Sequence, residues 1–316
     1  MTKHVLISGG AGFIGANFIA YLLKNTDYTI TNADCLTYAA SSENIQPFNN
    51  STRYRFIPYD ISCAGNEFLL FDQKYEVIIN FAAETHVDRS ISDASPFITT
   101  NINGTFHLLQ AVLTGKASKM IQISTDEVYG SLSRSEPPFT EQSALLPNNP
   151  YSASKASADL LVRSYYQTHS LPVIITRCSN NYGPMQHLEK FIPKVITHAL
   201  NDKKIPLYGD GMNIRDWVFV EDHCRAIHMV LEQGEAGEVY NIGGNTEKTN
   251  REVIEEILKQ TGKDINLIEY VEDRKGHDRR YAIDSSKIEK DLGWSPSISF
   301  HEGIKRTIEW YRQRLG

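Results

Sequence analysis

A glycine-rich turn near the amino terminus constrains the fold of this chain more than any other feature. Residues 4–8 form an apolar run suited to a buried parallel strand, and residues 16–24 have the spacing of an amphipathic helix. Between them, Gly9, Gly12 and Gly15 have the spacing that permits a tight turn, close backbone approach to a pyrophosphate and close helix packing. The helix N-terminus favours an anion. The pattern predicts a dinucleotide-binding unit, with a plain glycine-rich turn as the alternative.

An acidic residue after the next predicted strand supports this interpretation. The strand at 28–32 leads into Asp34, where a carboxylate can accept hydrogen bonds from both adenosine ribose hydroxyls. The same carboxylate would repel a 2′-phosphate, so we predict that NAD is bound rather than NADP. After a third strand at 53–57, Asp60 and Ile61 are expected near the adenine edge.

Strands and helices alternate up to about residue 177. Further strands are predicted at 77–81, 119–124 and 171–176, and a long helix at 97–114. This alternation predicts an α/β fold, a Rossmann doubly wound parallel sheet, over residues 1–177, which carry NAD and the catalytic residues. Residues 178–316 are expected to form mainly a smaller mixed α/β substrate-binding domain, with some segments returning to the first domain. The sequence there predicts a strand at 215–220 and a turn at 207–211. It also predicts four helices, at 188–200, 222–232, 250–261 and 301–314.

Composition narrows the class of protein. With 41% hydrophobic and 22% charged residues, the chain has the make-up of a soluble globular enzyme. No apolar run is long enough to span a membrane, and the first strand starts almost at Met1, so a cytoplasmic protein is expected. A net charge of −6 argues against a nucleic-acid partner. The cysteines lack paired metal-ligand spacing and are interpreted as reduced thiols, with no metal expected: Cys35, Cys63, Cys178 and Cys224.

Two short motifs carry the chemistry. Thr125, Asp126 and Glu127 follow the predicted strand 119–124, at the sheet edge where ligands bind in open α/β folds. Tyr151 and Lys155 are four residues apart, which places them on one face of a helix. A cation beside a phenol lowers the pKa of the phenol, so the pair can act as a base.

Two adjacent carboxyl groups are more than alcohol oxidation needs. Their mutual repulsion separates their titrations, so one can donate a proton while the other accepts one. A phenolate base together with two acid/base groups predicts an internal redox dehydratase. The alternatives are a solvated pair of carboxylates at a strand end and a packed aromatic at Tyr151.

These motifs resemble those of the extended short-chain dehydrogenase/reductase family. Within that family, the triplet Thr125-Asp126-Glu127 is similar to that of the dTDP-glucose 4,6-dehydratases. Sugar-nucleotide epimerases usually carry apolar or small residues at the Asp126 and Glu127 positions, since epimerisation needs no acid for a leaving hydroxyl. The likeness covers essentially the whole chain, including residues 80–88, 177–184, 215–217, 240–244 and 276–281.

The resemblance implies a mechanism. Tyr151, aided by Lys155, takes the proton of the sugar 4-hydroxyl as hydride passes from carbon 4 to NAD+, and Thr125 positions that hydroxyl. Glu127 then removes the proton on carbon 5, Asp126 protonates the departing 6-hydroxyl, and hydride returns to carbon 6. The product is a 4-keto-6-deoxy sugar nucleotide for deoxysugar or surface polysaccharide biosynthesis.

Three alternatives to this function stay open. A UDP-glucose 4,6-dehydratase and a sugar-nucleotide epimerase are the nearest, because thymidine over uridine follows from the likeness alone. Lys275 stands where many relatives carry proline, which leaves the nucleotide preference open. A non-catalytic NAD sensor is more remote, because such proteins tend to lose the pair that this chain retains at Tyr151 and Lys155.

The resemblance also implies the binding residues. Arg215 and Arg274 suit a diphosphate, whereas His86 can equally be a structural histidine. Cofactor contacts are expected from Gly9, Gly12, Phe13, Ile14, Gly15, Asp34, Cys35, Leu36, Thr37, Asp60, Ile61, Ala82, Ala83, Glu84, Thr100, Tyr151, Lys155 and Asn181. Substrate contacts are expected from His86, Thr125, Asn180, Lys190, Pro206, Leu207, Tyr208, Arg215, Asn250, Arg274 and His277.

Two helices carry more apolar residues than one sheet face needs. They are the helix at 97–114 and the one that follows Tyr151. In the extended family, two such helices from each subunit commonly form a four-helix bundle, so a homodimer is expected; burial in the subunit core is the alternative. The apolar residues of the second helix are Leu160, Leu161, Val162, Tyr165 and Tyr166.

Overall fold

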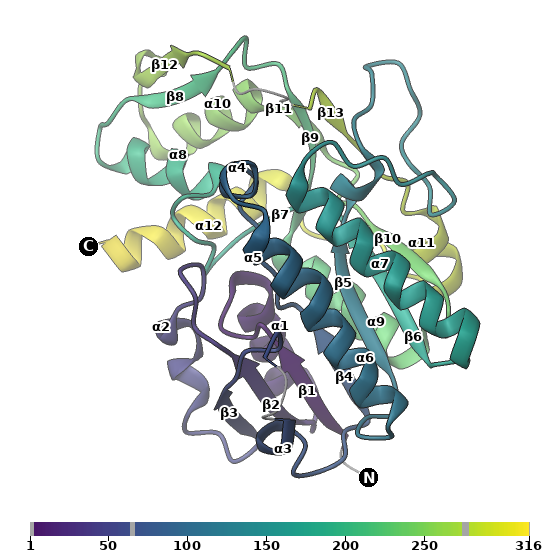
Figure 1. Ribbon diagram of the computed structural model, residues 1–316. Helices are drawn as coiled ribbons and strands as arrows, with labels where there is room; N and C mark the ends of the chain where they lie inside the picture. The colour runs from purple at the N-terminus through teal and green to yellow at the C-terminus, as the bar shows by residue number, and fades with distance from the viewer. Residues whose placement is uncertain (1–2, 64–66, 274–277, 316) are drawn as a thin grey trace.

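A seven-stranded parallel sheet forms the larger lobe of the protein (Figure 1). The computed structural model describes residues 3–63, 67–273 and 278–315. Along the sheet the strands follow the order β10-β6-β5-β4-β1-β2-β3, the doubly wound order with one strand added. The α/β fold and the parallel sheet are therefore confirmed. The strands are β1 (His4–Ser8), β2 (Thr29–Asp34), β3 (Tyr54–Pro58), β4 (Val77–Asn80), β5 (Met120–Thr125), β6 (Val173–Cys178) and β10 (Val239–Ile242).

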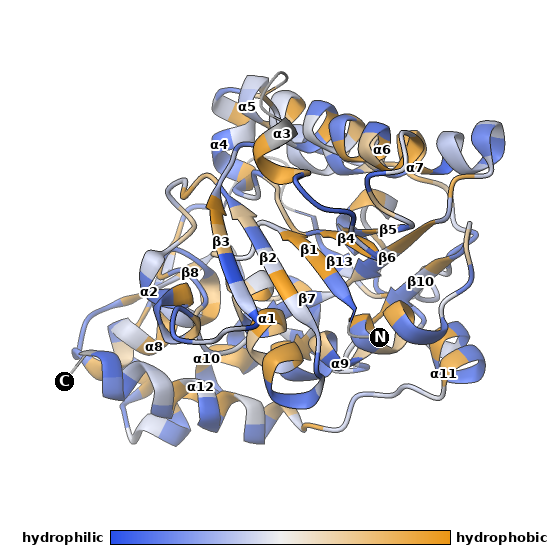
Figure 2. Cartoon of the chain, turned by 90° about the horizontal axis from the view of Figure 1, so that it is seen from below, coloured by the Kyte–Doolittle hydropathy of each residue, from blue (hydrophilic) through white to orange (hydrophobic). Residues whose placement is uncertain are grey.

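Helices cover both faces of this sheet (Figure 2). Successive side chains of a strand point to opposite faces, so Val5 and Ile7 contact one helical layer and Leu6 the other. This explains why the strands read as continuous apolar runs rather than as alternating ones. The first layer holds α1 (Phe13–Asn25), α9 (Val220–Gln233) and α11 (Ser286–Leu292). The second layer holds α6 (Thr105–Leu113) and α7 (Pro150–His169).

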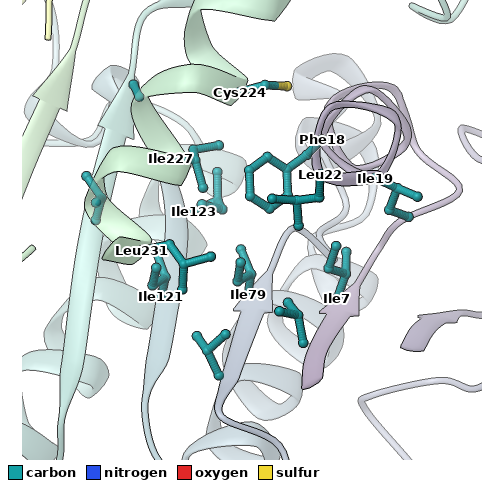
Figure 3. Close-up of a cluster of buried hydrophobic side chains, with 14 of the residues drawn as sticks. Ile7, Phe18, Ile19, Leu22, Ile79, Ile121, Ile123, Cys224, Ile227 and Leu231 are labelled. Atoms are coloured by element: carbon teal, nitrogen blue, oxygen red, sulfur yellow. The ribbon is translucent and has the colours of Figure 1, made fainter. Parts of the chain in front are cut away.

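The core between the sheet and the first layer is mainly aliphatic, with a few aromatic side chains such as Phe18 (Figure 3). Full burial of one such side chain stabilises the fold by about 1.5–3 kcal/mol, so this cluster holds α1 and α9 against the strands. The side chains meeting here are Ile7, Ile79, Ile121 and Ile123 of the sheet, Phe18, Ile19 and Leu22 of α1, and Cys224, Ile227 and Leu231 of α9.

A smaller lobe lies beyond the carboxyl ends of the sheet strands (Figure 1). Its own core includes Ile196, Trp217, Ile254 and Ile308. Strand β9 pairs with β7, β11 and β13, and β8 pairs with β12. The elements are α8 (Phe191–Leu200), α10 (Asn250–Thr261), α12 (Phe300–Leu315), β7 (Asn180–Tyr182), β8 (Ile205–Tyr208), β9 (Ile214–Phe219), β11 (Glu247–Thr249), β12 (Ile268–Val271) and β13 (Arg280–Tyr281).

Three local expectations for the second half of the chain differ from the structure. Strand β10, not predicted, joins the first sheet beside β6, with Tyr240 opposite Thr176. The predicted turn at 207–211 is wrong in its first part, because Leu207 lies in β8, where it pairs with Tyr270 of β12. The stretch after Cys178, for which no strand was predicted, contains β7, which is held by pairing with β9. The domain boundary near residue 177 stays a prediction.

The long helix expected at 97–114 is interrupted by a wider turn. It consists of α5 (Ser95–Phe97), the π-helical η2 (Ile98–Gly104) and α6, and π-helical turns often occur at functional sites. Within η2, the amide of Asn101 accepts from the backbone N–H of Glu84 at 2.8 Å and donates to Ser154 of α7 at 2.8 Å. The remaining short elements are α2 (Ser42–Ile45), η1 (Gln46–Phe48), α3 (Glu67–Leu70), α4 (Val87–Ser92), η3 (Asp126–Tyr129) and η4 (Ile265–Leu267).

The apolar residues of α7 that were named as more than one sheet face needs mostly pack inside the subunit. Val162 is fully buried, so for this residue the alternative of burial in the core beneath α6 and α7 holds. Leu161, Tyr165 and Tyr166 are partly buried against the same core. Leu160 alone of these five is largely exposed, at 56%.

None of the described helices combines the length and the hydrophobicity needed to cross a bilayer.

Candidate active site

Each of the three glycines of the first turn is present for a different physical reason. Gly9 has φ +78°, and a Cβ there would lie 2.5 Å from the backbone nitrogen of Ala82. At Gly15 a Cβ would lie 2.4 Å from the carbonyl oxygen of Gly9, so the chain's own packing requires both glycines. At Gly12 the nearest described atom is that same oxygen, at 3.3 Å. The space in front of Gly12 therefore belongs to a cavity rather than to packed protein.

This cavity, of about 330 Å³, runs from the glycine turn to the ends of β5 and β6. Gly12 is the N-cap of α1, and none of the described side chains caps this end, so its backbone N–H groups can bind an anion. The residues predicted to bind cofactor that line it are Gly9, Gly12, Phe13, Ile14, Gly15, Asp34, Cys35, Thr37, Asp60, Ile61, Ala82, Ala83, Glu84, Thr100, Tyr151, Lys155 and Asn181.

Asp34 is oriented at the end of β2 by the backbone. Its carboxylate accepts hydrogen bonds from the N–H groups of Ala11 at 2.9 Å and Leu36 at 2.8 Å. Burial raises the pKa of Asp34, and these two bonds oppose the rise. Leu36 was also predicted to touch the cofactor, but it does not line the cavity; its backbone holds Asp34 instead. Asp60 lines the cavity and accepts from the backbone and hydroxyl of Ser62.

A second cavity, of about 340 Å³, adjoins the first and reaches into the smaller lobe. Both cavities are lined by Thr85, Glu127, Asn180, Asn181, Gln186 and Lys190. The residues predicted to bind substrate that line the second cavity are His86, Asn180, Lys190, Pro206, Leu207, Tyr208, Arg215 and Asn250, whereas Thr125 lines the first. Arg274, Lys275 and His277 lie outside the described residues.

Asp126 lines the first cavity, where its surroundings disfavour the charged form of its carboxyl group. Thr125 ends β5, accepts from the N–H of Glu127 at 3.3 Å, and donates to Asp126 Oδ1 at 3.2 Å. The carboxyl of Asp126 is 2% exposed, and its Oδ2 has no hydrogen-bond partner among the described residues. Burial raises the pKa of Asp126 well above its usual range, and the carboxylates of Glu127 and Asp216 raise it further.

Glu127, its neighbour, is placed among cations. Burial raises the pKa of Glu127 too, but the positive charges of Arg215 and Lys190 oppose this rise. The hydroxyl of Ser152 also donates to its Oε2 at 3.3 Å. The arrangement thus favours a proton on Asp126 and gives Glu127 more support for its charge.

Tyr151 and Lys155 are buried on the first turns of α7. Burial raises the pKa of Tyr151 well above its usual range, Glu127 and other acidic groups add to this, and a hydrogen bond with Thr125 opposes it. The ammonium of Lys155 donates to the carbonyl oxygen of Ile123 at 2.7 Å. The expectation that Lys155 lowers the pKa of Tyr151 below its usual value is wrong here, because desolvation of the phenol dominates.

Sequence reasoning missed several lining residues. Gln186 lines both cavities, and its amide donates to the backbone of Asn181 at 2.9 Å. Tyr281 lines the second cavity, and the guanidinium of Arg215 stacks 4.3 Å from its ring centre. Both lie in or beside stretches already singled out by their likeness to the family, so that signal could have identified them.

His86 has a structural role and also lines the second cavity, so its contact with substrate stays a prediction. It is the N-cap of α4, where its Nδ1 accepts from the N–H of Arg89 at 3.4 Å, and it lines the second cavity. Its Nε2 lies 3.8 Å from Glu189.

All four cysteines are among the described residues and are free. Over the described ranges, no cluster of three or more His, Cys, Asp or Glu could hold a metal ion.

Comparisons with known proteins extend over the whole chain. The model of the family described as GDP-mannose 4,6 dehydratase matches residues 6–307. Low-salt glycan biosynthesis protein Agl12 of Haloferax volcanii is 51% identical, over 97% of this chain and 98% of its own. The dTDP-glucose 4,6-dehydratase of Streptomyces griseus is 46% identical, over 99% and 95%.

A solved structure gives the same result. The crystal structure of DesIV, a dTDP-glucose 4,6-dehydratase from Streptomyces venezuelae with NAD bound, has a TM-score of 0.94 and 47% identity, covering 99% of this chain and 98% of that one. The resemblance found in the sequence is thereby confirmed.

The glycine geometry yields a paired prediction. Gly15→Ala should destabilise the fold by about 1–3 kcal/mol, because the added Cβ meets backbone atoms that cannot move aside. Gly12→Ala should leave the urea midpoint near that of the wild type but weaken NAD binding at least tenfold. Urea unfolding and calorimetric titration with NAD measure the two effects. Equal loss of stability in both variants would contradict the assignment of Gly12 to the cofactor.

Proposed function

Since the chain belongs to the family described as GDP-mannose 4,6 dehydratase, we propose that it is an NAD-dependent dTDP-glucose 4,6-dehydratase. It converts dTDP-glucose to dTDP-4-keto-6-deoxy-glucose, a step of deoxysugar synthesis. One observation carries the proposal. Asp126 and Glu127 are neighbours that both line the cofactor cavity. The surroundings of Asp126 favour its protonated form, whereas Glu127 faces the cations Arg215 and Lys190. That is the pair an elimination of water needs.

The first cavity fits NAD. The open space at Gly12 and the uncapped end of α1 suit the pyrophosphate, and Asp34 suits the adenosine ribose. Bound NAD supplies a hydride acceptor for carbon 4, a hydride donor for carbon 6 and a positive charge near the phenol. Tyr151 takes the proton of the 4-hydroxyl, Thr125 positions that hydroxyl, and the ammonium of Lys155 supports the negative charge on the phenolate.

Elimination follows because the new 4-ketone acidifies the proton on carbon 5. Glu127 takes this proton, and Asp126 gives its own to the 6-hydroxyl, which leaves as water. When carbon 6 is reduced, Glu127 returns its proton to carbon 5. Tyr151 has then gained one proton and Asp126 has lost one, so a transfer through solvent restores both groups.

The second cavity suits the nucleotide. Arg215 and Lys190 line it, and their positive charges match a diphosphate. The nucleotide end is formed by Pro206, Leu207, Tyr208 and Asn250. An epimerase would need no acid at Asp126, and a sensor would need no base at Tyr151, so neither alternative explains these residues.

The test is to incubate the purified protein with NAD+ and either dTDP-glucose or UDP-glucose and to follow the sugar nucleotide by mass spectrometry. Loss of one water from dTDP-glucose is expected. Loss of water from UDP-glucose alone would overturn the nucleotide assignment, and no mass change with either substrate would overturn the dehydratase.

Substitution of Asp126 or Glu127 should slow the elimination of water and leave the oxidation of carbon 4 in place. Asp126→Asn and Glu127→Gln should each slow turnover by about 10²–10⁴, the usual contribution of general acid–base catalysis. Both variants should still oxidise carbon 4, so dTDP-4-keto-glucose should be detectable by mass spectrometry after rapid quenching. In D2O, Glu127→Gln should lose deuterium incorporation at carbon 5. As the matched control, Tyr151→Phe should form no 4-keto sugar at all; unchanged turnover in Glu127→Gln would remove it as the base.

We also propose a homodimer formed through α6 and α7. Packing between these neighbouring helices includes a hydrogen bond from Gln110 to the hydroxyl of Tyr165. Apolar side chains remain exposed on them, with Phe106 at 40% and Leu160 at 56%. Two such helices from each subunit can form a four-helix bundle.

The double variant Phe106→Asp, Leu160→Asp should shift the protein from dimer to monomer, because a charge in an apolar interface is costly to desolvate. Light scattering at micromolar concentration measures the mass. Ile265→Asp, at 51% exposure on the smaller lobe, is the control and should stay dimeric. A monomeric wild type would refute the proposal.

A further inference from the structure

A buried carboxylate that the mechanism above does not use lies one helical turn beyond Lys155. Asp159 is on α7, four residues after Lys155, so the two side chains share one face of the helix. Asp159 is 1% exposed, and its Oδ2 accepts from the Nε of Arg177 on β6 at 2.8 Å. Lys155 lines the cofactor cavity, so this ion pair lies directly behind a residue of the active site.

Arg177 continues a buried polar chain away from the cavity. Its Nη1 donates to the hydroxyl of Tyr129 at 2.9 Å, and that hydroxyl donates to Oδ1 of Asn241 on β10 at 2.8 Å. The guanidinium also lies 4.9 Å from the centre of the Tyr129 ring. Arg177 is therefore held by groups on α7, η3 and, through Tyr129, β10.

The hydrogen bonding of Asp159 is incomplete for a purely structural ion pair with Arg177. Its Oδ1 is buried and has no hydrogen-bond partner in the part of the chain that the structure describes. Buried oxygens of this kind are rare and costly, and a buried ion pair is itself weak support for stability. A role beyond stability is therefore indicated for the carboxylate.

Lys155 needs such a carboxylate. Desolvation lowers the pKa of its ammonium, and Asp159 is the leading group that opposes this, followed by Cys178. On the β5 side, the ammonium finds only the neutral carbonyl of Ile123 as its hydrogen-bond acceptor among the described residues. Asp159 on its own helix and Cys178 on β6 raise the pKa of Lys155, and Arg177 on β6 is the cation paired with Asp159.

We propose that Asp159 is a positioning residue of the reaction, whose buried carboxylate keeps Lys155 charged beside Tyr151 while Arg177 limits the strength of that effect. This rests on the proposed function, in which the charge of Lys155 supports the phenolate. Asp159 touches neither cavity, so it acts through Lys155 and not on the substrate.

The proposal makes two variants of the same ion pair behave oppositely. Asp159→Asn removes the negative charge and leaves Arg177 positive, so Lys155 should lose its proton at lower pH. Arg177→Gln removes the compensating cation, so Lys155 should keep its proton to higher pH. A purely structural role predicts similar damage from both, because each breaks the same contact.

The experiment isolates oxidation at carbon 4. Holoenzyme loaded with NAD+ is mixed with dTDP-6-deoxyglucose, which has no 6-hydroxyl to eliminate, and the absorbance of reduced nicotinamide is followed against pH. We expect the falling alkaline limb of the rate to move down by roughly one pH unit in Asp159→Asn and up, or not down, in Arg177→Gln. Asp159→Glu should restore the wild-type limb.

Asp222→Asn is the matched control, because Asp222 is equally buried and accepts from Arg225 at 2.8 Å but is not among the groups that act on the pKa of Lys155. It should lose stability without moving the limb. Shifts of the same sign in both ion-pair variants, or no shift in either, would overturn the positioning role. Should Asp159→Asn fail to fold, a downward shift in Arg177→Gln would still overturn it. Failure of the wild type to oxidise the analogue and to dehydrate dTDP-glucose would instead overturn the proposed function.

Discussion

The reversal of strand order between β1 and β4 is the constraint on which the rest of the site depends. Helices leave these two strands toward opposite faces, so a crevice opens at their carboxyl ends. Gly9 and Ala82 line that crevice from either side, with backbones too close for a Cβ. Because β5 and β6 continue the sheet in register, Thr125 and Cys178 end at the same edge. The cofactor cavity and the acid/base groups thus share one boundary.

Desolvation governs the electrostatics along this boundary. It raises the pKa of Asp126, Glu127 and Tyr151 and lowers that of Lys155, so burial opposes every charge in the site. What distinguishes the groups is the compensation each receives. Glu127 faces cations from the smaller lobe, and Lys155 has Asp159 behind it, whereas Asp126 faces further carboxylates. A site built this way can hold an acid and a base as immediate neighbours.

Local sequence patterns predicted the elements that depend on local physics. The first strand was expected at 4–8 and α10 at 250–261, and the structure has both with these bounds. Strand β10 could not be found in this way, because four residues gain their stability only by pairing with β6 across a long stretch of chain. The same holds for β7, and for the π-helical turn, whose Asn101 is held by Glu84 and Ser154. These elements are decided by partners distant in sequence.

The sequence by itself determined the cofactor class and the chemical groups of the site, because the glycine spacing, Asp34 and the Tyr151–Lys155 pair are recognisable from residue types and their spacing along the chain. Only the tertiary structure decided how those groups are protonated. The pKa of a side chain depends on its burial and on charges that the fold brings near, and for Asp126 and Glu127 these include Asp216 and Arg215, about ninety residues away. No local pattern carries that information, since the same two carboxyls in water would both be ionised.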